Sequence, residues 1–173
     1  MIMKEFEILE ATINDKDRLC DMFLNHITNH PEYISHGEIQ MGVGKGSMVD
    51  GTFVTEVSPM ARHYWIQYIT GNILDEESVV YKAVTPEGTI IGFCVCTIMR
   101  DGASPFGMLC DILVDETFRG GGVGTELITK GRSWFDSKGV SEIYLESGLH
   151  NHAAHEYFMR HGFVKISEIY KLM

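Results

Sequence analysis

Arg119–Gly124 has the residue types of a loop that binds a phosphate-bearing ligand. It follows the apolar run Met108–Val114 and precedes a segment with helical periodicity, an order that predicts strand, glycine-rich turn and helix. The first N–H groups of a helix have no intrahelical acceptor, and the helix dipole favours negative charge beside them. The sequence therefore predicts an anion site, such as a pyrophosphate site, at this turn.

Two common phosphate loops do not match the sequence. A Walker A loop ends in Gly-Lys followed by Ser or Thr, but Lys45 and Lys130 are each followed by glycine. The dinucleotide fingerprint G-x-G-x-x-G/A, placed on Gly120 or on Gly42, ends on a threonine or a serine. The loop instead has the pattern Arg-x-x-Gly-x-Gly, formed by Arg119 and two of the glycines that follow it.

A second motif lies downstream, after a segment that alternates like a strand. It reads Asn151-x-x-Ala154-x-x-Tyr157-Phe158-x-x-x-Gly162-Phe163. Together, the loop and this motif resemble the acetyl-CoA loop and the Asn-Ala-Tyr-Gly-Phe pattern of the GNAT superfamily of N-acetyltransferases. By motif, the resemblance covers residues 78–173. It implies transfer of an acetyl group from acetyl-CoA, as co-substrate, to a primary amine by direct attack.

The resemblance also implies roles for individual residues. Backbone groups of the strand before the loop, at Ile112, Leu113 and Val114, would bind pantetheine and the thioester carbonyl. Asn151 would contact the pantetheine arm, and Phe158 would pack against CoA. The N–H groups expected to bind the pyrophosphate are those of Arg119, Gly120, Gly121, Gly122, Val123, Gly124 and Thr125.

Asp111 and Tyr157 are the candidate catalytic residues. An attacking amine must first lose a proton, and Asp111 is a carboxylate in an otherwise apolar strand, where an unpaired charge is costly. It is either a base or substrate-positioning group, or a carboxylate paired within the core. Small-molecule members of the family carry Glu-Asp here, whereas this chain has Cys110 before Asp111.

The family's general-acid tyrosine falls on Phe158, which cannot donate a proton. Tyr157 precedes it and lies about 100° around a helix, so its direction does not follow from the alignment. Either water or another residue protonates the departing thiolate, or Tyr157 has taken that role through a local shift. A thiolate of ordinary pKa, about 8.5, leaves without an acid, so catalysis does not require one.

Composition narrows the class of partner. The 173 residues fit a single domain over 1–173, and the net charge of −10 argues against a nucleic-acid partner. We expect a cytoplasmic location, because Met1–Glu7 shows no signal sequence and no apolar run could span a membrane. The four cysteines lack zinc-site spacing, and a reducing cytosol suits them best. His150, His152 and His155 lack a completing carboxylate or cysteine, so no metal is expected.

The expected architecture is an α/β (α+β) fold of GNAT type: a mixed, mostly antiparallel central sheet of six to seven strands flanked by about four helices. Residues 31–57 are glycine-rich and weakly periodic, which indicates an irregular segment. Strands are expected at 6–12, 78–85, 90–100, 107–114, 142–147 and 163–172, and helices at 13–28, 59–70, 122–138 and 151–161.

The acceptor is expected to be a small-molecule amine, and a homodimer is possible because the resembling family often dimerises. Two other functions remain open. Cys110 and Phe158 also suit a CoA-binding regulatory or structural module with little turnover. A protein or peptide N-acetyltransferase is the third alternative, because the first 77 residues carry no diagnostic motif and would form much of the acceptor pocket.

Overall fold

The computed structural model describes residues 5–173 and contains a five-stranded sheet in the order β1-β4-β5-β6-β7. Neighbouring strands are antiparallel except β6 and β7, which run parallel. Strands β2 and β3 form a separate antiparallel sheet. Residues 1–4, the start of the stretch searched for a signal sequence, lie outside the described residues. The strands are β1 Glu7–Glu10, β2 Gly44–Val49, β3 Thr52–Val57, β4 Ser78–Val84, β5 Ile90–Met99, β6 Phe106–Val114 and β7 Ile143–Tyr144.

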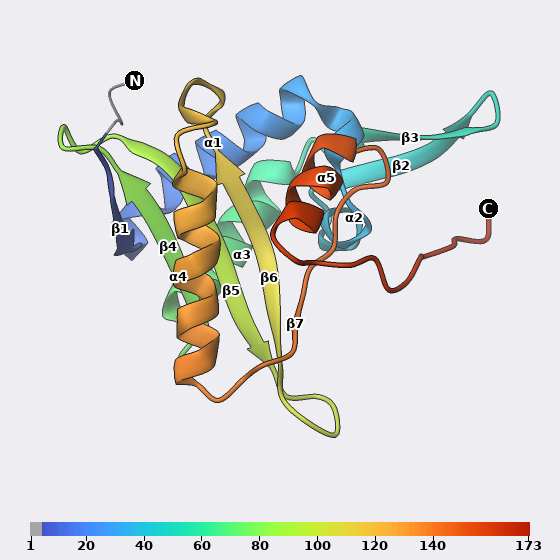
Figure 1. Cartoon of the computed structure of the whole chain (residues 1–173). Helices are drawn as coiled ribbons and strands as arrows, with labels where there is room; N and C mark the ends of the chain where they lie inside the picture. The colour runs from blue at the N-terminus through green and yellow to red at the C-terminus, as the bar shows by residue number, and fades with distance from the viewer. Residues whose placement is uncertain (1–4) are drawn as a thin grey trace.

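Helices cover both faces of the larger sheet. Figure 1 shows α4 on one face and α1 and α3 on the other, with α2 and α5 at the edge beyond β6. Among residues 5–173, no helix is long and apolar enough to cross a membrane. The α-helices are α1 Lys16–Asn29, α2 His36–Met41, α3 Ala61–Leu74, α4 Val123–Ser137 and α5 His152–Arg160.

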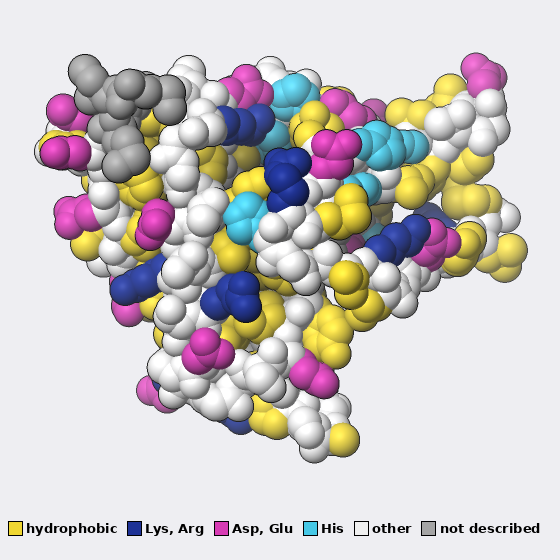
Figure 2. Space-filling model, in the orientation of Figure 1, with side chains coloured by type: hydrophobic (Ala, Val, Ile, Leu, Met, Phe, Trp, Pro, Cys, Tyr) yellow, Lys and Arg dark blue, Asp and Glu magenta, His cyan; other side chains and the backbone are white. Residues whose placement is uncertain are grey.

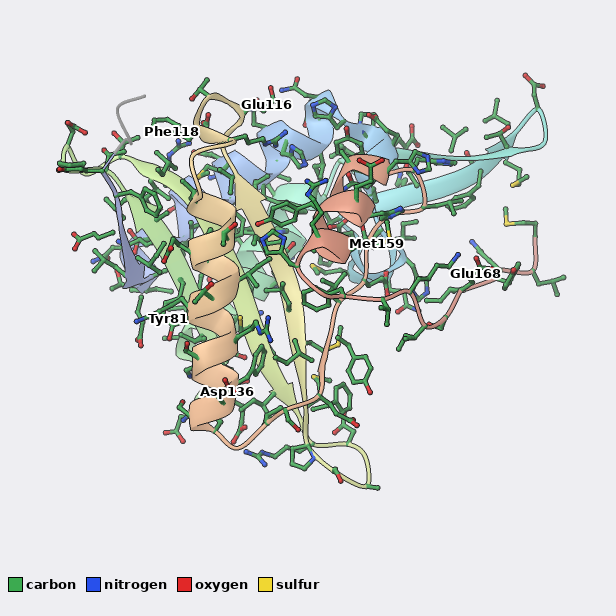
Figure 3. The ribbon with its side chains drawn as sticks, in the orientation of Figure 1. Tyr81, Glu116, Phe118, Asp136, Met159 and Glu168 are labelled. Carbon is green, nitrogen blue, oxygen red and sulfur yellow. The ribbon has the colours of Figure 1, made fainter. Side chains whose placement is uncertain are left out.

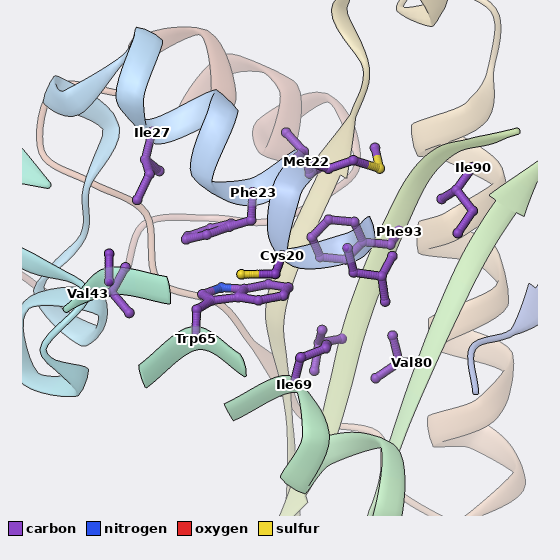
Figure 4. Close-up of a cluster of buried hydrophobic side chains, with 14 of the residues drawn as sticks. Cys20, Met22, Phe23, Ile27, Val43, Trp65, Ile69, Val80, Ile90 and Phe93 are labelled. Carbon is purple, nitrogen blue, oxygen red and sulfur yellow. The ribbon is translucent and has the colours of Figure 1, made fainter. Parts of the chain in front are cut away.

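The central strand β5 is apolar on both faces because it contributes to two cores. Phe93 and Val95 pack with α1 and α3, where Phe23 stacks on Trp65 with ring centroids 4.9 Å apart (Figure 4). Cys94, on the opposite face, packs with the buried side of α4. A strand buried on both faces needs such a continuous apolar sequence. The mixed, mostly antiparallel fold is therefore confirmed, with its strands divided between two sheets.

The prediction of an irregular segment at 31–57 is wrong. Ser35 caps α2 through a capping box with Glu38, and the β2–β3 hairpin turns at Asp50–Gly51, both with positive φ. Gly46 lies in β2 where a Cβ atom would overlap the ring of Phe53. The glycines here permit close packing, so their number does not indicate flexibility.

The last two predicted strands also differ from the structure. The strand expected at 142–147 is reduced to Ile143–Tyr144, because the chain separates from β6 beyond that point. The strand expected at 163–172 is absent, and the chain runs away from α5 without regular structure (Figure 1). The alternating apolar residues there pair with no strand among residues 5–173, and Val164, Tyr170 and Leu172 are exposed.

Candidate functional site

The glycine loop lies between β6 and the N-terminus of α4. A short 3₁₀ turn, Glu116–Phe118, leads into it, and the Arg119 side chain donates from Nε to the carbonyl oxygen of Val114, 3.1 Å away. Gly120 and Gly122 have φ values of 78° and 86°, in the left-handed region that favours glycine. In the part of the chain that the structure describes, residues 120–125 donate no backbone hydrogen bond. These N–H groups are available to an anion.

Strands β6 and β7 separate beside this loop. They pair only at Gly107 with Ile143 and at Met108 with Tyr144. From Leu109 onward, β6 bonds to β5 on one edge and has no strand partner among residues 5–173 on the other. The predicted pantetheine residues Ile112, Leu113 and Val114 all lie on this part of β6. The free edge offers backbone donors and acceptors to an extended ligand.

A cleft of about 290 Å³ opens where the strands separate. Its walls come from β6, the segment Leu145–Gly148, α5, and the three helices before β4. The structure brings Asp111, Asn151 and Phe158 together in this cleft, with Ile112 and Leu113. Trp65 lies at the base, and its buried indole N–H has no acceptor within residues 5–173. An unpaired buried donor is costly unless a ligand or water meets it.

Asp111 is half-buried in the cleft wall. Its Oδ2 accepts a hydrogen bond of 2.5 Å from the hydroxyl of Tyr68, a residue of α3. Burial raises the pKa of the Asp111 carboxyl to about 8, the charge of Glu38 adds to the rise, and the Tyr68 hydrogen bond opposes it. A carboxyl that titrates near neutral pH is suited to exchange a proton with an amine.

Sequence reasoning missed two further carboxylates of the cleft, Glu38 and Glu146. Glu38 accepts a hydrogen bond of 2.6 Å from the backbone N–H of Ser35, and burial, with a contribution from Glu146, raises its pKa. Glu146 accepts a hydrogen bond of 2.7 Å from the backbone N–H of Gly37. The Ser35-x-x-Glu38 spacing does indicate a capping box. It does not indicate that the charge of this carboxylate acts on Asp111, because Glu38 lies on α2 and Asp111 on β6.

Tyr157 and Phe158 point to different places. Phe158 lines the cleft, whereas the Tyr157 hydroxyl lies against Gly124 at the N-terminus of α4. That hydroxyl is buried without a hydrogen-bond partner of normal geometry among the described residues, and burial raises its pKa. Asn151 caps α5, its Oδ1 accepting from the N–H of Ala154 at 3.4 Å. Its position therefore has a structural reason as well as a possible binding one.

Cys110 lines the cleft as a protonated thiol. Burial raises its pKa to about 11, and its Sγ lies 3.7 Å from the carbonyl oxygen of Met108. A thiol of such high pKa is a poor nucleophile at neutral pH. The site therefore favours direct attack by the acceptor over an acyl-cysteine intermediate.

The histidines after β7 do not converge on a point. His155 donates to the carbonyl oxygen of Gly148 at 2.9 Å, and His150 to that of Phe53 at 3.4 Å. The group that could hold a metal in residues 5–173 lies elsewhere, at His26, His30 and Glu116. His26 also lines the cleft, and burial, with a contribution from Arg119, lowers its pKa to about 4.

The chain was compared with models of known protein families and with known proteins. Residues 49–163, well over half of the chain, match the model of the acetyltransferase (GNAT) family. An aminoglycoside N(6')-acetyltransferase type 1 from Stenotrophomonas maltophilia is 28% identical over 98 residues. That match covers 52% of this chain and 64% of the relative's length.

Solved structures with the same arrangement include enzymes with CoA ligands. The aminoglycoside N-acetyltransferase AAC(6')-Iy in complex with CoA has a TM-score of 0.70 at 16% identity, over 98% of this chain and 94% of that one. A protein from Clostridium acetobutylicum described as a predicted acetyltransferase, solved with acetyl-CoA, has a TM-score of 0.69 at 13% identity, over 98% of this chain and 96% of that one. At these identities the likeness establishes the fold.

Proposed function

This chain belongs to the acetyltransferase (GNAT) family, and from that premise we propose that it transfers an acetyl group from acetyl-CoA to a primary amine of a small molecule. The observation that carries the proposal is the position of Asp111. This half-buried carboxyl lies on the free part of β6, in the cleft that opens beside the glycine loop. Acetyl-CoA fits this arrangement, since the loop N–H groups suit its pyrophosphate and the unpaired edge of β6 suits pantetheine.

In the proposed reaction Asp111 accepts the proton of the bound ammonium group, and the neutral amine attacks the thioester carbonyl. A C–N bond forms and the C–S bond breaks. Backbone N–H groups on the free edge of β6 stabilise the oxyanion. The sulfur leaves as a thiolate and takes a proton from Tyr157 or from water, and the second proton that the attacking nitrogen loses restores that donor. The products are the acetamide and free CoA.

The acceptor class follows from the charge of the cleft. Glu38, Asp111 and Glu146 line one cavity, where the charge of Glu38 raises the pKa of Asp111 and the charge of Glu146 raises the pKa of Glu38. A ligand with several amino groups would neutralise them on binding. We therefore propose a polyamine, a class that includes the aminoglycosides for which the relatives are named.

The test is release of free thiol from acetyl-CoA with three acceptors: an aminoglycoside, spermidine and a peptide with a free N-terminus. We expect turnover with the polyamines and little with the peptide. CoA binding without thiol release from any acceptor would instead favour the regulatory module. Turnover with the peptide alone would favour the protein N-acetyltransferase. A reaction without acceptor measures background hydrolysis.

Tyr157 is proposed as the acid that protonates the thiolate. Its hydroxyl has no hydrogen-bond partner of normal geometry among residues 5–173, and it lies against Gly124 of the loop expected to hold the donor. We expect Tyr157→Phe to lower kcat about 100-fold if the hydroxyl acts as acid. Tyr144→Phe is the matched control, because that hydroxyl bonds Glu142 on the surface. An unchanged kcat in Tyr157→Phe would assign the proton to water.

A homodimer and a cytoplasmic location remain predictions. The apolar residues of 164–172 that lie exposed beyond α5 are the surface that supports the first of them. Light scattering on the full chain measures the oligomeric state, and a monomer at all concentrations would contradict the homodimer.

A further inference from the structure

Two histidines and a carboxylate meet at the end of α1, outside the residues used for acetyl transfer. His26 and His30 are four residues apart on this helix and its C-cap, so their rings share a face. Glu116 reaches them from the 3₁₀ turn between β6 and the glycine loop. The potential ligand atoms of the three residues lie within 4.8 Å of one another. Figure 3 places Glu116 at the top of β6, beside α1.

The surroundings hold His30 in the orientation of a metal ligand. Its Nε2 lies 3.0 Å from Oε1 of Glu116, and its Nδ1 lies 3.4 Å from Oε1 of Glu32. Tyr33 stacks on the ring, with centroids 4.8 Å apart and planes 13° apart. A carboxylate on the second nitrogen of a histidine fixes its tautomer and increases its basicity toward a metal.

An ion pair between His30 and Glu116 leaves His26 unexplained. Among residues 5–173, no hydrogen bond uses the ring nitrogens of His26, although its ring lies 5.4 Å from that of His30. A ligand atom lies about 2 Å from zinc, so two ligand atoms of a tetrahedral site lie about 3.3 Å apart. The ligand atoms here lie within 4.8 Å of one another and need to close by up to about 1.5 Å, through rotation of the Glu116 and histidine side chains.

We propose that His26, His30 and Glu116 bind a divalent transition-metal ion of the zinc class, with water in the fourth position. Two imidazoles and one carboxylate are a common ligand set for zinc. The ion would join α1 to the segment that enters the glycine loop, at the rim of the cleft that His26 lines. Figure 2 shows histidine and basic side chains gathered at this end of the molecule. The sequence alone did not predict this site, because Glu116 is 86 positions from His30.

One neighbouring charge opposes the metal. Arg119 lies close enough to His26 to act on its charge, whereas Glu32 and Glu116 act in the opposite sense. Replacing Arg119 with glutamine removes a positive charge from beside the site. We therefore expect Arg119→Gln to bind the metal more tightly than the natural chain does. An ion that acted on the glycine loop alone would not bind more tightly to this variant.

The experiment is a Co²⁺ titration of the tag-free protein, followed by absorption in the visible range, with Zn²⁺ used to displace the cobalt. We expect one ion per chain and d–d bands without a thiolate charge-transfer band. His30→Ala and Glu116→Gln should each weaken binding about tenfold or more. His152→Ala is the matched control, because that residue belongs to the histidine set after β7, and it should bind as the natural chain does.

His26→Gln is the second variant, chosen because the ring nitrogens of His26 take part in no hydrogen bond among residues 5–173. Thermal unfolding in EDTA checks that each variant is folded, and added Zn²⁺ should raise the Tm of the natural chain but not of Glu116→Gln. Absence of a saturable cobalt spectrum, or equal binding by the natural chain and the His26 and Glu116 variants, would overturn the proposal. These readouts do not depend on acetyl transfer, so they stand apart from the proposed function.

Discussion

Replacing Asp111 with asparagine is expected to lower kcat for acetyl transfer by about 100- to 10,000-fold, the range typical of losing a positioned proton acceptor. The amide keeps the shape of the side chain and still accepts from Tyr68, so the wall of the cleft is preserved. It cannot accept a proton from the bound amine. The kcat/KM of the natural enzyme should rise with pH through an apparent pKa near 8, and this limb should disappear in the variant.

The same substitution should stabilise the fold at high pH. The Asp111 carboxyl has a pKa of about 8 in the folded protein and an ordinary value of 3.8 when exposed, so the folded state binds the proton more tightly. Stability is therefore lost as pH rises from about 4 to 8, and the loss is complete above the folded pKa. Asp111→Asn does not titrate, so its gain should be on the order of a few kcal/mol at pH 8.5 and should vanish near pH 4.

Urea unfolding at both pH values measures this difference. Asp136→Asn is the control, because that carboxylate is exposed at the far end of α4 (Figure 3). A variant that is less stable than the natural protein at pH 8.5 would show that Asp111 is a structural partner of the core. A stable variant with full activity would remove it as the base.

These expectations could be drawn only in part from the sequence. The residue type and the apolar strand around it identified Asp111 as unusual, because a burial cost follows from local sequence. The residues that interact with Asp111 could not be predicted from the sequence. Tyr68 lies 43 positions away on α3, and Glu38 belongs to a segment that was expected to be irregular. Contacts between elements depend on how helices pack on the sheet, which periodicity does not encode.

Some strands could be predicted from local sequence and others could not. β4, β5 and β6 were predicted because apolar runs and the Pro86–Gly88 turn are local signals. The β2–β3 hairpin was missed although Asp50–Gly51 is a hairpin dipeptide, since the glycines around it masked the alternation. Residues 163–172 alternate like a strand, yet no sheet edge of the described chain pairs with them. Alternation indicates a preference for extended structure, and a partner strand must still be present.

Replacing Gly122 with leucine is expected to weaken CoA binding at least about 100-fold, or by about 2.7 kcal/mol. Gly122 precedes α4 with φ of 86°, and a Cβ there would meet no heavy atom within 4 Å. The new side chain would therefore lie in the open space over the loop N–H groups, where an anion must approach. Calorimetric titration with CoA measures the affinity without requiring an acceptor.

Backbone strain must be separated from this effect, and Gly88 provides the comparison. Its φ is 85°, it also has open space at the Cβ position, and it lies in the turn between β4 and β5. Leucine in the left-handed region costs roughly 1–2 kcal/mol at either position, so both variants should lose similar stability. Only the Gly122 variant should lose CoA. Equal CoA affinity in the two variants would mean that the loop is a structural turn, and that the donor binds elsewhere along β6.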